Sequence, residues 1–330
     1  MKEQIRAYLL EGTPDAVHGT VKSIPSSSLP PGQVTLQVLY SGINFKDAMI
    51  AAGVGKMVRK FPHVPGIDLS GTVESDSSGR FKPGAQVLVT GYDLGVGAWG
   101  GYAEAARVPS DWVVPLPPGL SLRDAAALGT AGFTAMLAVL ALERNGLKAS
   151  QGPVLVTGAT GGVGSIAVDL LAGSGYTVAV SSGKPDMAAF LTKLGASQIL
   201  TREQVTDASG KIMLNTQWAG AVDSAGGTTL EYLLRTVKGW GSVALTGLVS
   251  SPQFSATVYP FILRGVNLLG IDSVNCPTER RLEAWRLLAG TRKPRHLEDI
   301  ARVIGMDDLP AKLKDILSGN ARGRYVLKVA

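Results

Sequence analysis

The chain has 330 residues, 45% of them hydrophobic and 18% charged, so it can bury a large core, and at roughly 150 residues per domain we expect about two domains. The single cysteine, Cys276, excludes an intramolecular disulfide and a zinc site built from several thiolates. Lys and Arg give a formal net charge of +6 but are interspersed with Asp and Glu and form no basic tract, so we expect no nucleic-acid partner.

The N-terminus and the hydropathy of the chain bear on its location. The first six residues lack the apolar core of a signal peptide. No uninterrupted apolar run approaches the ~20 residues of a membrane span. We therefore expect a cytoplasmic protein without a membrane anchor.

Short apolar stretches alternate with turn signals in the N-terminal part of the chain, which is the pattern of a compact β-rich domain. Strands are predicted at residues 34–40, 69–73, 85–90 and 112–117. Residues 122–143 are rich in Ala and Leu, which predicts helical structure with interruptions at Thr130 and Gly132. We expect a second architecture to begin there.

Strands and helices alternate in the next part of the chain. We predict strands at residues 153–157, 177–181, 220–223, 242–246 and 266–271, and helices at 161–172, 185–194 and 229–237. This alternation predicts a parallel, doubly wound sheet. We predict helices at 280–288 and 310–317 and a strand at 324–329 in the tail, which we expect to return to the first domain.

A glycine-rich turn joins the predicted strand 153–157 to the next helix, and it reads Gly158-Ala159-Thr160-Gly161-Gly162-Val163-Gly164. A dinucleotide pyrophosphate needs close backbone approach, free N–H donors and the positive end of a helix dipole. The spacing of Gly158, Gly161 and Gly164 meets these needs. A tight turn without a ligand would also need glycine, but the strand-helix-strand context favours dinucleotide binding.

The end of the second strand predicts which dinucleotide binds. An NAD site usually places Asp or Glu there to accept a hydrogen bond from the ribose 2′-hydroxyl, but no carboxylate stands between Val180 and Lys184. Ser182 and Lys184 would instead donate to a 2′-phosphate, which favours NADPH. The alternative is that Lys184 is a solvated turn residue. Arg202, after a third strand candidate, would close over the adenine end.

Several motifs resemble those of the medium-chain dehydrogenase/reductase superfamily and, within it, the acryloyl-CoA (acrylyl-CoA) reductase or quinone-oxidoreductase-like group. Besides the glycine-rich turn, these are SGINFKD at residues 41–47, FPHVPGIDLSG at 61–71, WGGYAE at 99–104, GTAGFTAM at 129–136, PFILR at 260–264 and GIDSV at 270–274. The resemblance implies an α/β protein with two domains. Residues 1–124 and 275–330 would form a GroES-like, β-rich catalytic domain, and residues 125–274 a Rossmann domain with a doubly wound parallel sheet that binds NADPH. Members are typically homodimers, often joined through the edge of the Rossmann sheet.

The resemblance also implies a set of cofactor contacts. The residues are Phe45, Thr160, Gly161, Gly162, Val163, Ser182, Gly183, Lys184, Arg202, Leu248, Ile262, Ser273 and Asn320. The group commonly has Tyr where this chain has Phe45. A phenylalanine can stack on a nicotinamide ring but cannot donate a hydroxyl proton or hydrogen bond, so any mechanism that needs that hydroxyl is excluded here.

Zinc-dependent relatives hold a catalytic metal with Cys, His and carboxylate ligands. In this chain His18, His63 and His296 lie far apart, and Ile67-Asp68 stands where zinc members have His-Glu. We expect no metal site, and we expect His63 to be a packed or surface imidazole.

Conjugate hydride addition is easier than ketone reduction without a Lewis acid, because charge spreads onto the carbonyl oxygen. The predicted function is therefore NADPH-dependent reduction of the activated C=C bond of a short enoyl thioester, acryloyl-CoA to propionyl-CoA. The alternative is an NADPH:quinone or enone oxidoreductase, which needs the same cofactor. A third hypothesis is a cofactor-binding protein without significant catalysis.

The candidate catalytic residues are Asn44 as a donor, Asp47 as the group that orients it or a nearby loop, and Tyr92 as a hydroxyl that supplies a proton, directly or through water. Each has a structural alternative: turn formers for the first two and a surface aromatic for Tyr92. Asp68 would hold Lys46 or the loop geometry. Arg264 and Arg324 would meet CoA phosphates, although arginines at strand ends are more often solvated or salt-bridged.

Overall fold

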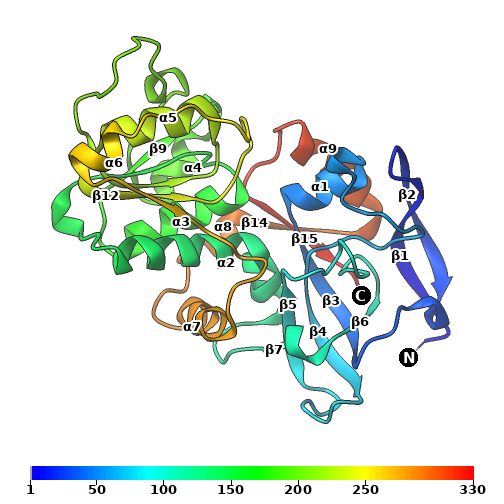
Figure 1. Ribbon diagram of the computed structural model, residues 1–330. Coiled ribbons are helices and arrows are strands. Elements are labelled where there is room, and N and C mark those ends of the chain that lie inside the picture. Colours follow the sequence, from blue (N-terminus) through cyan, green and yellow to red (C-terminus); the bar gives the residue numbers. More distant parts are fainter. Residues whose placement is uncertain (1) are drawn as a thin grey trace. The chain divides into compact units, whose positions relative to one another are not determined.

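The computed structural model describes residues 2–330, which form two compact units (Figure 1). The first unit contains the chain up to Thr130 together with Val274–Gly290 and Leu297–Ala330. The second contains Ala131–Ser273 and Thr291–His296. The chain therefore leaves the first unit, builds the second, and returns.

The first unit is built on a seven-stranded sheet in the order β14-β15-β3-β4-β5-β7, with β6 also paired to β3. Its strands are β3 (Val34–Ile43), β4 (Asp68–Asp76), β5 (Gln86–Thr90), β6 (Ala105–Val108), β7 (Val114–Pro115), β14 (Ala301–Ile304) and β15 (Arg324–Lys328). A separate hairpin consists of β1 (Gln4–Thr13) and β2 (Ala16–Pro25). The helices are α1 (Phe45–Ala51), α7 (Thr278–Ala289), α8 (Leu297–Ile300) and α9 (Leu309–Leu317).

Three of the four strands predicted in the N-terminal part of this unit are confirmed, and the fourth is shorter than predicted. A 3-10 turn over Ser110–Trp112 replaces the start of the strand predicted at 112–117 and leaves only Val114–Pro115 extended. The tail returns to the first unit as expected, because β15 pairs antiparallel with β3, from Tyr325 opposite Ile43. This pairing places the last strand beside the segment that carries Asn44.

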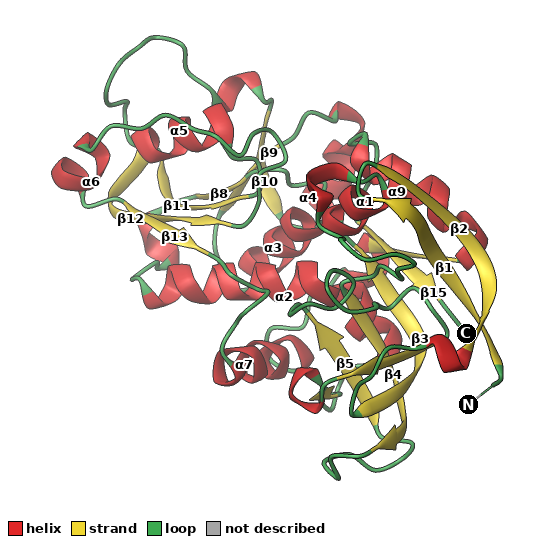
Figure 2. Cartoon of the chain, turned by 45° about the vertical axis from the view of Figure 1, so that its right-hand side comes forward, coloured by secondary structure: helices red, strands yellow, loops and turns green. Residues whose placement is uncertain are grey.

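The second unit has a six-stranded, fully parallel sheet in the order β10-β9-β8-β11-β12-β13. The strands are β8 (Val154–Val156), β9 (Val178–Ser181), β10 (Ala196–Leu200), β11 (Trp218–Asp223), β12 (Val237–Leu245) and β13 (Asn267–Gly270). Helices α5 (Gly227–Thr236) and α6 (Tyr259–Arg264) lie on one side and α3 (Gly162–Gly173) on the other, with α4 (Ala188–Lys193) after β9 (Figure 2). The predicted doubly wound Rossmann sheet is confirmed, because its strand order reverses at β8.

Helix α2 (Leu122–Arg144) corrects one expectation. It is long and apolar enough to cross a membrane, with a mean hydropathy of 1.9 in its most apolar window, although no such run was expected. Because 89% of that window is buried inside the protein, α2 is a core helix. Gly129, at φ 48° and ψ −153°, breaks the helix beside the predicted interruption at Thr130.

Candidate functional site

The glycine-rich turn lies at the carboxyl end of β8 and opens helix α3. Gly158 has a φ of 59°, and its carbonyl oxygen accepts a hydrogen bond from the N–H of Gly161 at 2.9 Å. A Cβ on Gly164 would lie 2.4 Å from the Gly158 oxygen, so glycine is needed where the helix packs on the turn. The first N–H groups of a helix have no acceptors within it, so the start of α3 suits an anion such as a pyrophosphate. Four predicted cofactor residues lie together here: Thr160, Gly161, Gly162 and Val163.

Asp223, at the end of the neighbouring strand β11, supports this turn. The Thr157 hydroxyl donates to the Asp223 carboxylate at 2.5 Å, and the Thr157 N–H donates to the carbonyl of Val222 at 3.0 Å. Asp223 also accepts a hydrogen bond from the Gly226 N–H at 2.9 Å. Burial raises the pKa of Asp223, and these hydrogen bonds oppose the rise. The start of the turn is thus fixed to β11 by a buried carboxylate.

The residues predicted to meet the 2′-phosphate follow the next two strands. Ser182 comes directly after β9, and its N–H donates to the carbonyl of Leu200 on β10 at 3.0 Å. A Cβ on Gly183 would lie 2.5 Å from Nε of Arg202, so the Arg202 side chain lies against Gly183. Ser182, Gly183, Lys184 and Arg202 therefore gather at the carboxyl edge of the sheet.

The other predicted cofactor residues of the second unit divide between two edges of its sheet. Leu248 follows β12 and Ser273 follows β13, so both come after carboxyl ends of strands, like the glycine-rich turn. Ile262 lies on α6, whose end meets the amino end of β12: a Cβ on Gly265 would lie 2.8 Å from the ring of Trp240. The structure thus places Ile262 at the opposite edge of the sheet, apart from the other cofactor residues.

The remaining predicted site residues belong to the first unit. Phe45, half-buried, is the first residue of α1, and Asn44 immediately precedes it. Tyr92 follows β5, and Asn320 is exposed after α9, a helix that packs against α1. Asn44, Phe45 and Asp47 are brought together by the first turn of α1.

Asp47 fixes the start of α1 from inside the protein, where its side chain is fully buried. Its Oδ2 accepts hydrogen bonds from the backbone N–H of Asn44 at 2.9 Å and from Asn44 Nδ2 at 3.1 Å. Its Oδ1 accepts the N–H of Ile67 at 2.9 Å. Asp47 therefore caps the helix and ties it to the chain entering β4.

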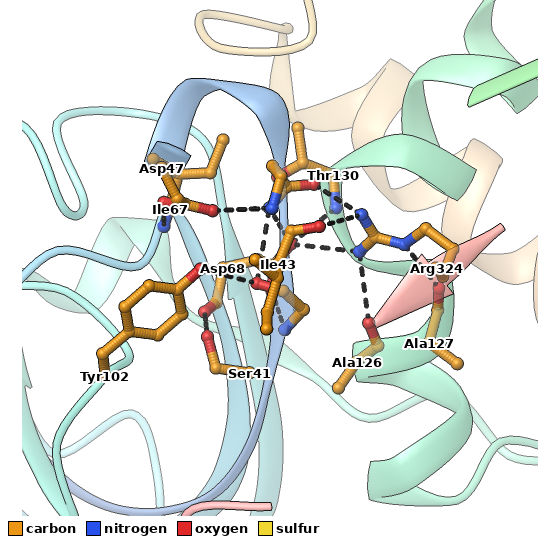
Figure 3. A network of polar contacts seen from close by, with 12 residues as sticks. Ser41, Ile43, Asp47, Ile67, Asp68, Tyr102, Ala126, Ala127, Thr130 and Arg324 are labelled. Atoms are coloured by element: carbon orange, nitrogen blue, oxygen red, sulfur yellow. Dashed lines mark hydrogen bonds and ion pairs between the residues drawn. The ribbon is translucent and has the colours of Figure 1, made fainter. Parts of the chain in front are cut away.

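Asp68 is the second buried carboxylate of this network, and it lies between Tyr102 and Arg324 in Figure 3. Its oxygens accept hydrogen bonds from Gly42 N–H at 2.5 Å, Asn44 Nδ2 at 2.9 Å and Thr130 N–H at 3.0 Å. The sequence left two roles for Asp68: to hold Lys46 or to fix the loop. These hydrogen bonds show that Asp68 fixes the loop, and its carboxylate lies 3.7 Å from the guanidinium of Arg324.

Arg324, the first residue of β15, has only 2% of its surface exposed. Its guanidinium donates to the carbonyl of Ile43 at 2.9 Å, to Oδ1 of Asn44 at 2.8 Å and to the carbonyl of Ala127 at 3.1 Å. The expectation that Arg324 meets a CoA phosphate is therefore wrong, because the pairing of β15 with β3 buries it. The guanidinium of Arg264 is also engaged, by the carbonyls of Arg235 and Leu214 at 2.8 and 2.6 Å.

Burial dominates the electrostatics of this network. It raises the pKa of Asp47 to about 6, with a further rise from the charge of Asp68, against the hydrogen bonds that Asp47 accepts. Burial also raises the pKa of Asp68, and the positive charge of Arg324 is the largest opposing effect. Burial lowers the pKa of Arg324 and raises that of Tyr102 well above its usual value. Two carboxyl groups thus share one buried cation.

Two members of the network, Tyr102 and Thr130, were not among the predicted site residues, and a third, Arg324, was expected in a different role. Tyr102 and Thr130 lie within the family motifs at 99–104 and 129–136, which was a signal of their importance. The Asn44 side-chain amide donates hydrogen bonds to both buried carboxylates. Asp47 therefore orients Asn44, as predicted. The catalytic roles of Asn44, Asp47 and Tyr92 remain predictions.

His63 is a packed imidazole, one of its two predicted environments. It is 3% exposed, and its Nε2 lies 3.0 Å from the carbonyl oxygen of Gly95. Burial lowers the pKa of His63. Within residues 2–330, no three His, Cys, Asp or Glu side chains gather in an arrangement that could hold a metal ion.

Comparisons with known proteins agree with this architecture. Residues 30–118 match the family described as "Alcohol dehydrogenase GroES-like domain", and residues 162–290 match the family described as "Zinc-binding dehydrogenase". The first match falls in the first unit, and the second begins within the glycine-rich turn, at Gly162.

Two curated relatives match nearly the whole chain. The chain is 50% identical over 309 residues to "Acrylyl-CoA reductase AcuI" of Ruegeria pomeroyi, covering 94% of each chain. It is 47% identical to "Putative quinone oxidoreductase YhfP" of Bacillus subtilis, covering 100% of both.

Solved structures show the same fold around a bound dinucleotide. The yhdH oxidoreductase from Salmonella enterica, in complex with NADP, is 42% identical with a TM-score of 0.95, over 98% of this chain and 100% of that one. The Bacillus subtilis protein yhfP, with NAD bound, is 47% identical with a TM-score of 0.95, over 99% and 100%. One of these two structures thus holds NADP and the other NAD.

Proposed function

The chain belongs to the medium-chain dehydrogenase/reductase superfamily, and on that basis we propose that it is an NADPH-dependent reductase that converts acryloyl-CoA to propionyl-CoA. The observation that carries the proposal is 50% identity, over 94% of the chain, to a protein named as an acrylyl-CoA reductase. The glycine-rich turn at the head of α3 supports the same chemistry class. Residues 1–124 and 275–330 would carry the catalytic residues, and residues 125–274 the cofactor.

The residues at the carboxyl edge of the second sheet fit NADPH. The start of α3 offers backbone N–H donors to the pyrophosphate, and Arg202 lies against Gly183, where the 2′-phosphate would be met. No carboxylate stands among Ser182, Gly183 and Lys184 to favour NAD. The NADP complex of the Salmonella enterica relative supports this preference.

The reduced nicotinamide supplies a hydride for the β-carbon of the enoyl thioester. The protein's part is to orient the acyl group, stabilise the negative charge that develops on the thioester oxygen, and deliver a proton to the α-carbon. We assign proton delivery to Tyr92. Asn44 and Asp47 act through the first turn of α1, whose buried hydrogen bonds hold the loop that carries Phe45.

An NADPH:quinone or enone oxidoreductase is the second candidate, favoured by 47% identity to a protein named as a putative quinone oxidoreductase. The two differ in whether the site accepts a flat ring or a short acyl thioester. NADPH oxidation should be compared with acryloyl-CoA, longer enoyl-CoA esters and small quinones under the same conditions. Quinones turned over much faster than every enoyl-CoA would reject the first proposal in favour of the second, and NADPH binding without consumption would reject both.

We also propose that the protein is a cytoplasmic homodimer that needs no zinc. Exposed apolar side chains gather on and beside α6, with Trp240 82%, Ile262 70%, Leu263 66% and Val258 64% exposed, next to the edge strand β13. An apolar surface of this kind beside a free sheet edge is typical of a subunit interface. Light scattering should give twice the chain mass, and metal analysis of the active enzyme should give far less than one zinc per chain.

A further inference from the structure

Arg281 is a charged side chain with an unusual position on helix α7. It has 1% of its surface exposed, whereas the adjacent Arg280 is exposed and Leu282 is 45% exposed. Moving a guanidinium out of water is costly unless its N–H groups find partners. A buried arginine between exposed neighbours therefore indicates a specific task.

The Arg281 guanidinium joins two segments that are far apart in the sequence. One terminal nitrogen donates to the carbonyl of Thr90 at 2.6 Å and to the Thr90 hydroxyl at 3.0 Å. The other donates to the carbonyl of Val274 at 3.1 Å. Thr90 ends strand β5, and Val274 directly follows Ser273, one of the proposed cofactor residues. The planar fork of an arginine presents donors to two backbone carbonyls in a fixed geometry, whereas a lysine ammonium is a single rotatable donor group.

Tyr92 is held by the same residue. The Arg281 guanidinium carbon lies 4.3 Å from the centroid of the Tyr92 ring, within the range of a cation–π contact. The ring also stacks on Trp112, with centroids 5.4 Å apart and planes within 1°. The Tyr92 N–H donates to the carbonyl of Val274 at 3.0 Å. Tyr92 has a φ of 53°, a conformation that non-glycine residues keep only where their surroundings impose it.

We infer that Arg281 is a positioning residue that fixes the hydroxyl of Tyr92 for proton delivery and sets the path of the chain after Ser273. The inference rests on the proposed function. In the step concerned, the O–H bond of Tyr92 breaks and a C–H bond forms at the α-carbon with the electron pair of the enolate. The phenolate then regains a proton from water, so Tyr92 returns to its starting state.

The test compares Arg281→Met with Arg280→Met, a matched loss of the neighbouring exposed arginine. In the cofactor-free protein, amide hydrogen exchange of residues 90–94 should become faster in Arg281→Met and stay unchanged in Arg280→Met. With acryloyl-CoA and NADPH, kcat of Arg281→Met should fall by about 10-fold to 100-fold, as expected for a displaced catalytic group. Its solvent deuterium isotope effect on kcat should increase because protonation becomes slower than hydride transfer.

Arg281→Lys, which keeps the charge but not the fork, is the second variant in case Arg281→Met does not fold. It should share the faster exchange at residues 90–94 and the larger solvent isotope effect. If the folded Arg281 variants match Arg280→Met in both measurements, the inference is overturned. The activity of the wild type with acryloyl-CoA and NADPH tests the proposed function by itself. If the wild type is active, full activity in Tyr92→Phe would overturn the inference alone, because it would remove Tyr92 as the proton donor.

Discussion

Replacement of Arg324 by Met should strongly destabilise the first unit. The substitution removes the cation that faces Asp68 at 3.7 Å, in a pair whose side chains are 2% and 1% exposed. It also leaves the carbonyl of Ile43 and Oδ1 of Asn44 without their guanidinium donors. Breaking a buried ion pair from one side typically costs about 3–5 kcal/mol, because the remaining charge stays buried and unpaired.

For a domain of this size, each kcal/mol lowers Tm by roughly 2–4 °C, so the loss corresponds to roughly 6–20 °C. Thermal unfolding followed by circular dichroism would measure it. In the variant, Asp68 no longer faces the positive charge of Arg324, which opposes the rise of its pKa. The pKa of Asp68 should therefore be higher in the variant than in the wild type. A carboxyl group with a raised pKa in the folded protein stabilises below its unfolded pKa and loses that contribution as pH rises. The defect of Arg324→Met should therefore be larger at pH 8 than at pH 5.

Two controls separate charge from hydrogen bonding. Arg324→Lys keeps the cation but cannot bridge Ile43, Asn44 and Ala127, so we expect an intermediate loss. The double variant Asp68→Asn with Arg324→Met should lose less than the sum of the single variants, because no unpaired charge remains. A loss below about 1 kcal/mol in Arg324→Met, equal at both pH values, would refute the view that this ion pair holds the unit together.

Three further predictions concern other parts of the two units. The pKa of Asp47 lies at about 6 in the folded protein against 3.8 as its ordinary value, so Asp47 alone should cost the wild type about 2 kcal/mol of stability as pH rises from 4 to 7. Denaturant titrations should show a smaller loss over this range in Asp47→Asn, and an equal loss would contradict the assignment. Arg202→Ala and Lys184→Ala should each raise KM for NADPH about 10-fold to 100-fold in steady-state kinetics and leave KM for NADH nearly unchanged; equal shifts for both cofactors would reject the phosphate assignment. Gly164→Ala should destabilise the cofactor-free protein much more than Gly161→Ala. The added Cβ would lie 2.4 Å from the Gly158 oxygen in the first variant and 3.3 Å from it in the second. Equal midpoints of thermal unfolding in the two variants would contradict this prediction.

The second unit was the more predictable from sequence, because its central strands β8, β9 and β11 are buried throughout and appear as short apolar runs. The helix after the glycine-rich turn, α3 (Gly162–Gly173), begins and ends one residue from the prediction of 161–172. Its start is set locally by glycines and by a strand directly before it. In contrast, the hairpin of β1 and β2 was not predicted. The residues of β2 alternate between exposed and partly buried, and such a strand has little of the apolar pattern that sequence analysis detects.

The site in the first unit could be predicted only in part, since long-range pairing creates it. Asn44 and Asp47 are three residues apart, so their contact follows from the first turn of α1. Arg324 looks like a solvated strand-end arginine in the sequence. It becomes buried because β15 joins β3 at the position where Asp68 enters β4 from the other side. No local pattern predicts that three segments meet there.

The contacts of Ile67 and Asp68 also support our proposal that the protein needs no zinc. Ile67 and Asp68 stand where the sequence comparison with zinc-dependent relatives expects His-Glu, and the side chain of Ile67 has no lone pair to offer a metal. The Ile67 N–H donates to Asp47, while the oxygens of Asp68 accept three N–H groups and face Arg324. A metal ion at this position would have to displace a guanidinium and break several buried hydrogen bonds, and it would gain one carboxylate ligand in return. The first unit therefore uses these residues to fix the loop before α1, because a positively charged arginine already occupies the place where a cation would bind.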